Sequence, residues 1–203
     1  MVTHSKFPGM SRPLDCTLRL KTFASRSEYQ LVLGAVRKLQ DSGFYWGTAT
    51  GGQANLLLSS QPAGTFLIRD SSDRRHFFTL SVKTDLGTKN LRIQCEQCSF
   101  FLQTDPRSTQ PVPRFDCVLK LVHHYMPGSG LEAPASPGAK RAYFIYSGGE
   151  KIPLLLMKPL PSSVSTLQHL CRKTVNGHLE ACDKRAQLPA PIREFLEEYD
   201  APV

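Results

Sequence analysis

The sequence predicts an α+β fold, in which a central antiparallel sheet is flanked by two helices and a small all-helical segment follows at the C-terminus. Three observations predict it. Residues 65–95 contain three strand-like segments separated by turns, an order typical of an antiparallel meander. Segments with a helical spacing of apolar residues stand before and after this meander. Beyond Pro159 and Pro161 only the helical spacing remains.

Size and composition limit the possible folds. With 203 residues, 40% of them hydrophobic, the chain can form one medium domain with its own core and a smaller appendage. No run of about 18 apolar residues occurs, so no membrane span is expected. The first residues lack the apolar core of a signal peptide, which predicts an intracellular protein. Six cysteines scattered along such a chain are expected to be free thiols.

The charge pattern separates two classes of ligand. The formal net charge is +8, but lysines and arginines are dispersed and interleaved with acidic residues. A nucleic-acid-binding protein usually concentrates its positive charge in one stripe. The pattern therefore favours an anionic ligand or an acidic partner surface, and no nucleic-acid partner is expected.

The first elements follow from local patterns. Residues 1–19 are polar and contain proline, which predicts disorder. Ser27 and Gln30 have the spacing of a capping box, and Gly43 can end a helix. Between them we predict an amphipathic helix over residues 27–41, with its apolar positions at Tyr29, Val32, Leu33, Val36 and Leu39.

The meander and the helices around it come next. Residues 54–58 resemble the end of a second helix. Residues 65–69 form an apolar strand, and residues 76–83 alternate, with Phe78, Leu80 and Val82 on one face. After a turn at residues 84–88, residues 90–95 form the third strand. Helical spacing returns over residues 115–125.

Residues 127–140 interrupt this pattern. The segment is too rich in proline, glycine, alanine and serine to pack, which predicts a flexible insertion. Strand-like residues 142–146 and 151–156 follow, joined by a turn. Because β-patterning resumes here, we assign this hairpin to the same domain as the meander.

The C-terminal residues predict two or three short helices. Ser165 and Gln168 have capping-box spacing, Gly177 is expected to break the helix, and Pro191 suits the first turn of the next. About 40 residues with short helices cannot bury their apolar stripes well, so a partner protein is expected to cover them. The two stripes are Leu167, Leu170, Cys171 and Val175, and then Ile192, Phe195, Leu196 and Tyr199.

Arg69 is the main candidate binding residue. It ends a strand whose continuous apolar run indicates burial on both faces, and a buried guanidinium without a partner costs several kcal/mol. Two partners are possible. One is a structural carboxylate such as Asp70 or Asp73. The other is an anionic ligand, held by the planar guanidinium and the small donors of Ser71 and Ser72.

The meander favours the anionic ligand. In the predicted pairing, Thr79 and Arg92 of the next two strands approach the same face as Arg69. A hydroxyl and a second cation would then lie near the guanidinium. We therefore predict an anion site at the end of the first strand.

Catalytic and metal chemistry is not indicated. Cys95 and Cys98 form a C-x-x-C, but no second ligand pair follows at regular spacing, and the motif leaves a strand rather than opening a helix. Cys117 and His124 are seven residues apart on one helix, roughly 10 Å of rise, too far for a nucleophile and its base. The sequence predicts a protein without an active site, metal or cofactor.

Several motifs resemble known families. Phe66–Ser72 is similar to the phosphotyrosine-binding signature of Src-homology-2 (SH2) domains, and residues 44–47 and 121–125 resemble the entry and the second helix of that domain. Thr166–Cys171 resembles the elongin-binding half of a SOCS box, and Leu188–Pro191 its LPxP cullin-binding motif. Together they resemble the suppressor of cytokine signalling family. Residues 20–23 and 198–203 point to one particular member.

The resemblance implies a role for each candidate residue. Arg69 is implied to be the essential phosphotyrosine-binding residue, and Gly51 stands where many SH2 domains place another arginine. Further contacts with the phosphate are expected from Ser71, Ser72, Thr79 and Arg92. Elongin-binding residues are implied at Leu167, Leu170 and Cys171, and cullin-binding residues at Leu188, Pro189 and Pro191.

The N-terminal region resembles the family's kinase inhibitory region, a pseudosubstrate of Janus kinases. The implied inhibitory residues are Leu20, Lys21, Thr22 and Phe23. Phe23 has no hydroxyl to phosphorylate, and Lys21 and Arg26 flank it with positive charge. The residues alone also fit a disordered basic tail with an incidental phenylalanine.

The implied protein is a non-catalytic adaptor. It docks on tyrosine-phosphorylated cytokine receptors, inhibits the associated Janus kinase, and recruits elongin B–elongin C and a cullin scaffold as the substrate receptor of a ubiquitin ligase. A cytoplasmic location is expected, with recruitment to the inner face of the plasma membrane by receptors. The implied parts are an inhibitory region (20–28), an extended SH2 helix (29–43), an SH2 domain (44–158) and a SOCS box (159–203).

Overall fold

The computed structural model describes residues 21–102, 112–127, 143–147, 150–179 and 185–203. The predicted disordered residues 1–19, Leu20 and most of the predicted insertion lie outside these ranges. The elements in chain order are α2 (Arg26–Ser42), α3 (Gly51–Ser59), β1 (Thr65–Asp70), β2 (Phe78–Thr84), β3 (Gly87–Glu96), β4 (Ser99–Leu102), α4 (Val118–His124), β5 (Tyr143–Ser147), β6 (Glu150–Leu154), β7 (Lys158–Pro159), α5 (Leu167–Leu179), a 3-10 turn (Arg185–Gln187) and α6 (Ala190–Glu197).

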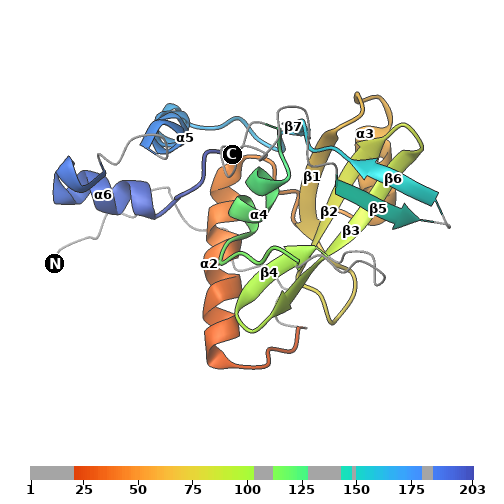
Figure 1. The fold of residues 1–203 in the computed structure, drawn as a ribbon, viewed down its shortest axis with the longest axis horizontal. Helices are drawn as coiled ribbons and strands as arrows, with labels where there is room; N and C mark the ends of the chain where they lie inside the picture. Colours follow the sequence, from red (N-terminus) through yellow and green to blue (C-terminus); the bar gives the residue numbers. More distant parts are fainter. Residues whose placement is uncertain (1–20, 103–111, 128–142, 148–149, 180–184) are drawn as a thin grey trace, which may run out of the picture.

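A five-stranded sheet in the order β4-β3-β2-β1-β7 forms the centre of the molecule (Figure 1). The predicted meander of three antiparallel strands is confirmed as β1–β3. Two strands were not predicted. β4 pairs with β3 across a tight turn in which Gln97 and Cys98 have φ of 51° and 54°, so the C-x-x-C forms a hairpin turn. β7 pairs with β1 in parallel, although only antiparallel pairing was expected.

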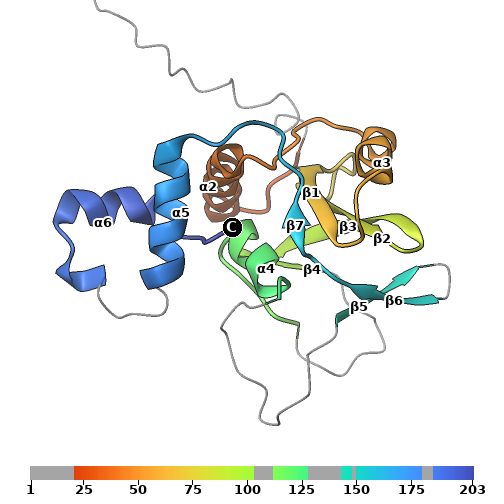
Figure 2. The same cartoon turned by 90° about the horizontal axis from the view of Figure 1, so that it is seen from above.

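Helices cover both faces of this sheet, as predicted. α2 and α4 lie on one face, where their buried side chains share a core with Phe66, Ile68, Phe78 and Leu80. α3 lies on the other face, where Ala54 and Leu58 pack against Leu67. Seen from above, α2 and α4 stand on one side of the sheet and α3 on the other (Figure 2). The apolar run of β1 is therefore buried on both faces, as its sequence indicated.

Helix α2 begins earlier than predicted. The N-cap is Ser25, whose Oγ accepts a hydrogen bond from the N–H of Glu28, so the proposed cap at Ser27 is wrong. Glu28 accepts from the N–H of Ala24, and this contact favours the earlier start. Gly43 ends the helix in the left-handed conformation, with φ of 78°, as predicted.

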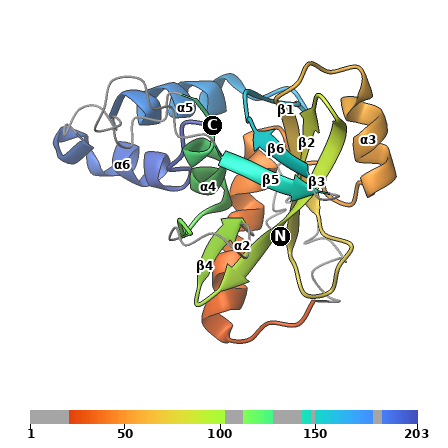
Figure 3. The same cartoon turned by 45° about the vertical axis from the view of Figure 1, so that its right-hand side comes forward.

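Strands β5 and β6 form the predicted hairpin as a separate two-stranded sheet. Figure 3 shows the hairpin beside the main sheet, close to β2 and β3. Ile145 and Ile152 are buried in the same core as α2 and α4, so the hairpin belongs to this domain.

The C-terminal helices pack against α2. The N-cap of α5 is Thr166 rather than Ser165, and Gly177 does not break this helix, which continues to Leu179. Of the two predicted stripes, the second is partly covered by the chain itself. Leu196 and Tyr199 are buried, and Tyr199 joins the core of α2 and α4.

No helix in the described ranges is long and apolar enough to cross a membrane.

Candidate functional site

Arg69 is the next-to-last residue of the apolar strand β1. Its backbone pairs with Thr79 of β2, and Thr79 pairs with Arg92 of β3. Directly paired residues of antiparallel strands point to the same face. This is the face that α3 covers, because Leu67, two residues before Arg69, packs against α3. Arg69 is only 5% exposed, so the predicted burial of its guanidinium is confirmed.

The guanidinium of Arg69 donates to neutral oxygens. Nε bonds Ser81 Oγ, Nη2 bonds Asn90 Oδ1 and Nη1 bonds the backbone carbonyl of Asp70, each at 3.1 Å. The Ser81 hydroxyl also donates to Asn90 Oδ1 at 2.7 Å. Burial lowers the pKa of Arg69, and the charge of Asp70 only partly opposes this effect.

Within the described ranges, the structure does not give Arg69 a carboxylate as a hydrogen-bond partner, which was one of the two possibilities. The Asp70 carboxylate accepts a hydrogen bond from the Tyr45 hydroxyl, and Asp73 faces His76 and Arg92. The hydrogen bonds of Arg69 orient its fork but bring no negative charge into contact with it. This arrangement fits an anion site.

The N-terminus of α3 lies beside the guanidinium. Thr50 caps this helix in a capping box with Gln53. A Cβ atom at Gly51 would lie 3.4 Å from Arg69 Nη2. Position 51, where many SH2 domains have a second arginine, thus borders the site, and its glycine adds space instead of charge.

The β1–β2 loop, residues 71–77, closes one side of the site. Ser71 is buried; its N–H donates to the carbonyl of Phe77 at 3.0 Å, and its Oγ accepts from the N–H of Asp73 at 3.2 Å. Ser72 is exposed. Of the two predicted phosphate donors, Ser71 is therefore engaged inside the loop, while Ser72 faces solvent.

Thr79 and Arg92 lie in the same row as Arg69 but differ in exposure. Thr79 is 4% exposed. The side chain of Arg92 is 58% exposed, and its Nε lies 3.5 Å from Asp73 Oδ2. The N–H of Arg75, followed by the charges of His76 and Arg92, lowers the pKa of Asp73. Arg92 is thus held at the loop, and its contact with a ligand stays a prediction.

The residues before α2 are packed against this loop. Lys21 Nζ donates to three loop carbonyls, and burial lowers its pKa, an effect that Asp70 and Asp73 oppose. The Phe23 ring stacks on Phe77, with centroids 5.1 Å apart. This packing differs from the alternative of a disordered tail.

Helix α5 presents two different faces. Its predicted elongin-binding face is exposed: Leu167 is 77% and Leu170 47% exposed, and Cys171 is exposed as well. The opposite face, with His169, Arg172 and other buried residues, packs against α2 and α6. The first apolar stripe is thus left uncovered by the described part of the chain.

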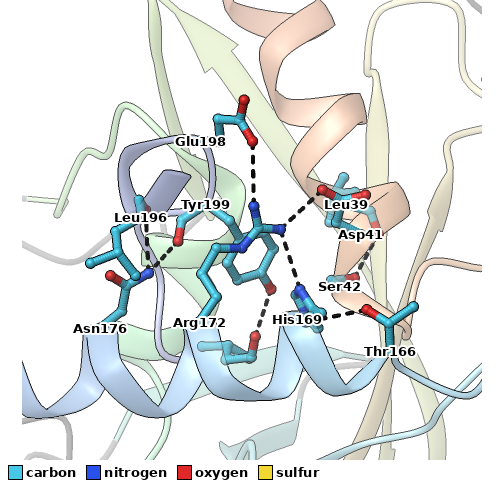
Figure 4. A network of polar contacts seen from close by, with 11 residues as sticks. Leu39, Asp41, Ser42, Thr166, His169, Arg172, Asn176, Leu196, Glu198 and Tyr199 are labelled. Atoms are coloured by element: carbon cyan, nitrogen blue, oxygen red, sulfur yellow. Dashed lines mark hydrogen bonds and ion pairs between the residues drawn. The ribbon is translucent and has the colours of Figure 1, made fainter. Parts of the chain in front are cut away.

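A buried arginine joins the C-terminal helices to α2 (Figure 4). Arg172 Nη2 lies 3.2 Å from Asp41 Oδ2 and 3.5 Å from His169 Nδ1. Its Nη1 lies 3.6 Å from Glu198 Oε2, and its guanidinium lies over the ring of Tyr199. The Tyr199 hydroxyl is buried and donates to a backbone carbonyl, which keeps it from solvent.

The predicted cullin-binding residues lead into α6. Leu188 is half-buried, whereas Pro189 and Pro191 are exposed. Pro189 is the N-cap, and a proline stands in the first turn, as predicted.

Sequence reasoning missed two site residues, Ser81 and Asn90. Both lie in predicted strands, on the same face as Arg69. Both are polar residues at positions that point to the same covered face of the sheet as Arg69. Because buried polar groups need hydrogen-bond partners, this pattern could have identified them.

Comparisons with known proteins agree with this geometry. The SH2 domain family model matches residues 44–125. The chain is 75% identical to "Suppressor of cytokine signaling 3" of Gallus gallus and 70% identical to the same-named protein of Homo sapiens, and each alignment covers 100% of both chains. It is 36% identical to "Suppressor of cytokine signaling 2" of Homo sapiens over 81% of this chain and 79% of that protein. The first two relatives carry the name of the family member that residues 20–23 and 198–203 indicated, so this expectation is confirmed.

Proposed function

The chain belongs to the suppressor of cytokine signalling family, and we propose that it is a non-catalytic negative regulator of cytokine signalling. Its SH2 domain binds phosphotyrosine on activated cytokine receptors. Arg69 is the central residue of this site, with Ser71, Ser72, Thr79 and Arg92 around it. The name of its relatives supports the regulatory role, and the SH2 match supports the ligand.

One observation carries the binding function. Arg69 is buried, yet its hydrogen-bond acceptors are the neutral oxygens of Ser81, Asn90 and a backbone carbonyl. Burying a charge without an opposite charge is unfavourable. A phosphate dianion supplies that charge and matches the planar fork with paired hydrogen bonds.

Arg69→Lys tests this function because it keeps the charge but loses the fork. We expect affinity for a pool of phosphotyrosine peptides to fall at least about 100-fold in calorimetry, the loss of two charge-assisted hydrogen bonds. Arg114→Lys is the matched control, since Arg114 is exposed and faces Glu96. Unchanged affinity of the Arg69→Lys protein would contradict the proposal.

The second part of the proposal is inhibition of Janus kinases by residues 20–28 as a pseudosubstrate, through Leu20, Lys21, Thr22 and Phe23. Phe23 offers an aromatic ring without an acceptor hydroxyl, which supports blockage without turnover. In the structure this ring stacks on Phe77 and meets Tyr29 edge-on. Engagement of a kinase therefore requires Phe23 to leave these contacts.

Two variants of Phe23 separate the alternatives. Phe23→Ala should lose inhibition of a purified Janus kinase, and Phe23→Tyr should restore the ring and become phosphorylated itself. Full inhibition by Phe23→Ala would reject the pseudosubstrate role.

The third part is recruitment of elongin B–elongin C by Leu167, Leu170 and Cys171. The exposure of this apolar stripe supports it, because a partner that covers the stripe removes it from water. Leu167→Asp should abolish recovery of elongins in a pull-down. Val164→Asp, at a residue that is 97% exposed but precedes α5, is the control. Elongin binding by Leu167→Asp would count against this surface.

The remaining parts concern the cullin and the location. We propose that Leu188, Pro189 and Pro191 contact a cullin scaffold, which makes the protein the substrate receptor of a ubiquitin ligase. The exposure of both prolines supports this contact. We also propose a cytoplasmic location, with receptors recruiting the protein to the inner face of the plasma membrane.

A further inference from the structure

Lys21 reaches from the segment before α2 into the β1–β2 loop. Its Nζ donates to the carbonyls of Ser71 at 2.8 Å, Asp73 at 2.6 Å and His76 at 2.8 Å. An ammonium group has three hydrogens to donate. All three are therefore used to hold the backbone of one loop from one side.

This contact decides where the N–H groups of the loop point. In a trans peptide unit the carbonyl and the following N–H point in opposite directions. Because the carbonyls of Ser71 and Asp73 face Lys21, the N–H groups of Ser72 and Arg74 face away from it. Neither of these two groups donates to another residue within the described ranges, whereas the N–H groups of Ser71 and Asp73 do.

Such N–H groups on one side of a turn are suited to an anion. We propose that Lys21 is a positioning residue of the phosphotyrosine site, which holds the loop carbonyls so that the N–H groups of Ser72 and Arg74 meet the phosphate bound by Arg69. This role rests on the proposed binding function.

Two further contacts hold the segment that contains Lys21 in place. Phe23 stacks on Phe77 at the far end of the loop, and the N–H of Ala24 donates to Glu28 of α2 at 2.5 Å. Lys21 is thus held in place before a ligand arrives, which limits the entropy lost on binding.

The same contact links two functions of the chain. Lys21 and Phe23 lie in the segment proposed to reach a kinase. If a kinase pulls Lys21 out of the loop, phosphotyrosine affinity falls, and bound phosphotyrosine opposes that removal by the same factor.

The test uses the full chain and N-acetyl-phosphotyrosine amide as the probe, titrated by NMR. For Lys21→Met we expect binding about tenfold weaker, the effect of losing hydrogen bonds to a charged group. Lys21→Arg retains donors and should recover part of the affinity. Lys83→Met is the matched control, because Lys83 also donates to a backbone carbonyl, that of Ser59, away from the loop.

A measurement on the unchanged chain does not depend on the folding of a variant. The N–H resonances of Ser72 and Arg74 should move downfield when the probe binds. Binding without a shift of these two resonances overturns the role of Lys21, and so does Lys21→Met binding within twofold of the unchanged chain, or an equal loss in Lys83→Met.

Failure of the proposed function looks different. If the unchanged chain does not bind the probe, or if Arg69→Lys binds it equally well, the SH2 function itself is rejected. Binding that Arg69→Lys abolishes and Lys21→Met leaves intact rejects only the role of Lys21.

Discussion

Within the described ranges two arginines are almost completely buried, and they are held in opposite ways. Arg69 is 5% exposed and Arg172 is 6% exposed. The hydrogen-bond acceptors of Arg69 are neutral oxygens, whereas Arg172 faces the carboxylates of Asp41 and Glu198. Both guanidinium groups are oriented, but only Arg172 has ion-pair partners of its own among the described residues.

The partners of a buried charge distinguish a structural residue from a binding residue. Burial by itself does not indicate a binding site, because Arg172 is as deeply buried as Arg69 and joins α5 to α2. The charge of the hydrogen-bond and ion-pair partners separates a structural arginine from a binding arginine. Arg172 is part of the structure that fixes the C-terminal helices, whereas we propose that an anion from outside the chain completes the environment of Arg69.

The largest expected effect concerns Arg172. Arg172→Ala removes the cation between Asp41 and Glu198 and its packing on Tyr199, so the free energy of unfolding should fall by about 3 kcal/mol in a denaturant titration. Phosphotyrosine affinity should not change, because this network lies behind α2 and not at the β1–β2 loop.

Arg69→Met gives the opposite pattern. Its unfolding free energy should stay within about 1 kcal/mol of the unchanged chain, because an uncompensated buried charge is removed, while phosphotyrosine binding is lost. Equal destabilisation by the two substitutions would remove the distinction between the two arginines.

Ligand binding should stabilise the chain through Arg69 alone. At a phosphotyrosine peptide concentration 100 times the Kd, the unfolding free energy rises by about 2.7 kcal/mol. Thermal unfolding with and without peptide measures this. Arg172→Lys should keep the full increase and Arg69→Lys should show none; an increase in Arg69→Lys would place the phosphate elsewhere.

Ser81 is expected to have a smaller effect, through the orientation of Arg69. Ser81→Ala removes one of the hydrogen bonds that orient Arg69, so phosphopeptide affinity should fall about fivefold to tenfold in calorimetry. Thr84→Ala, in the same strand but bonded to the carbonyl of Gly87, serves as the control. Equal affinity in the two variants would show that the fork does not depend on Ser81.

The smallest effect is a pH dependence in the Arg172 network. Burial, followed by the charges of Lys173 and Arg172, lowers the pKa of His169 from its ordinary value of 6.5, while Asp41 opposes the shift. The guanidinium of Arg172 can only donate, so Nδ1 of His169 accepts from it, and the proton that charges the ring would have to sit on Nδ1 against this cation.

The sign follows from linkage. The unfolded chain takes up the proton at higher pH than the folded chain, so stability is full above the ordinary pKa and is lost as pH falls below it. His169→Gln should lose less stability than the unchanged chain between about pH 7.5 and pH 5.5, measured by denaturant unfolding at each pH. Parallel losses in both proteins would exclude His169 as the cause.

Local sequence patterns were sufficient to predict several strands and helices of the fold. The alternation of β2, the continuous apolar run of β1 and the helical spacing of α2 each depend on which face of an element is buried, and that information lies within a few residues. The same patterns identified Arg69, because a cation at the end of a doubly covered strand needs a partner.

Other features depended on residues far apart in the chain. The two residues of β7 pair with β1 across some 90 positions, and a strand this short has no periodicity to detect. Gly177 stays within α5, and a Cβ atom at this position would lie 3.5 Å from Pro202, far along the chain. The neutral partners of Arg69, Ser81 and Asn90, are set by strand register. The sequence indicated that Arg69 must have a partner. Only the folded sheet decided that, within the described ranges, its hydrogen-bond acceptors are neutral oxygens, because long-range strand pairing places Ser81 and Asn90 beside the guanidinium.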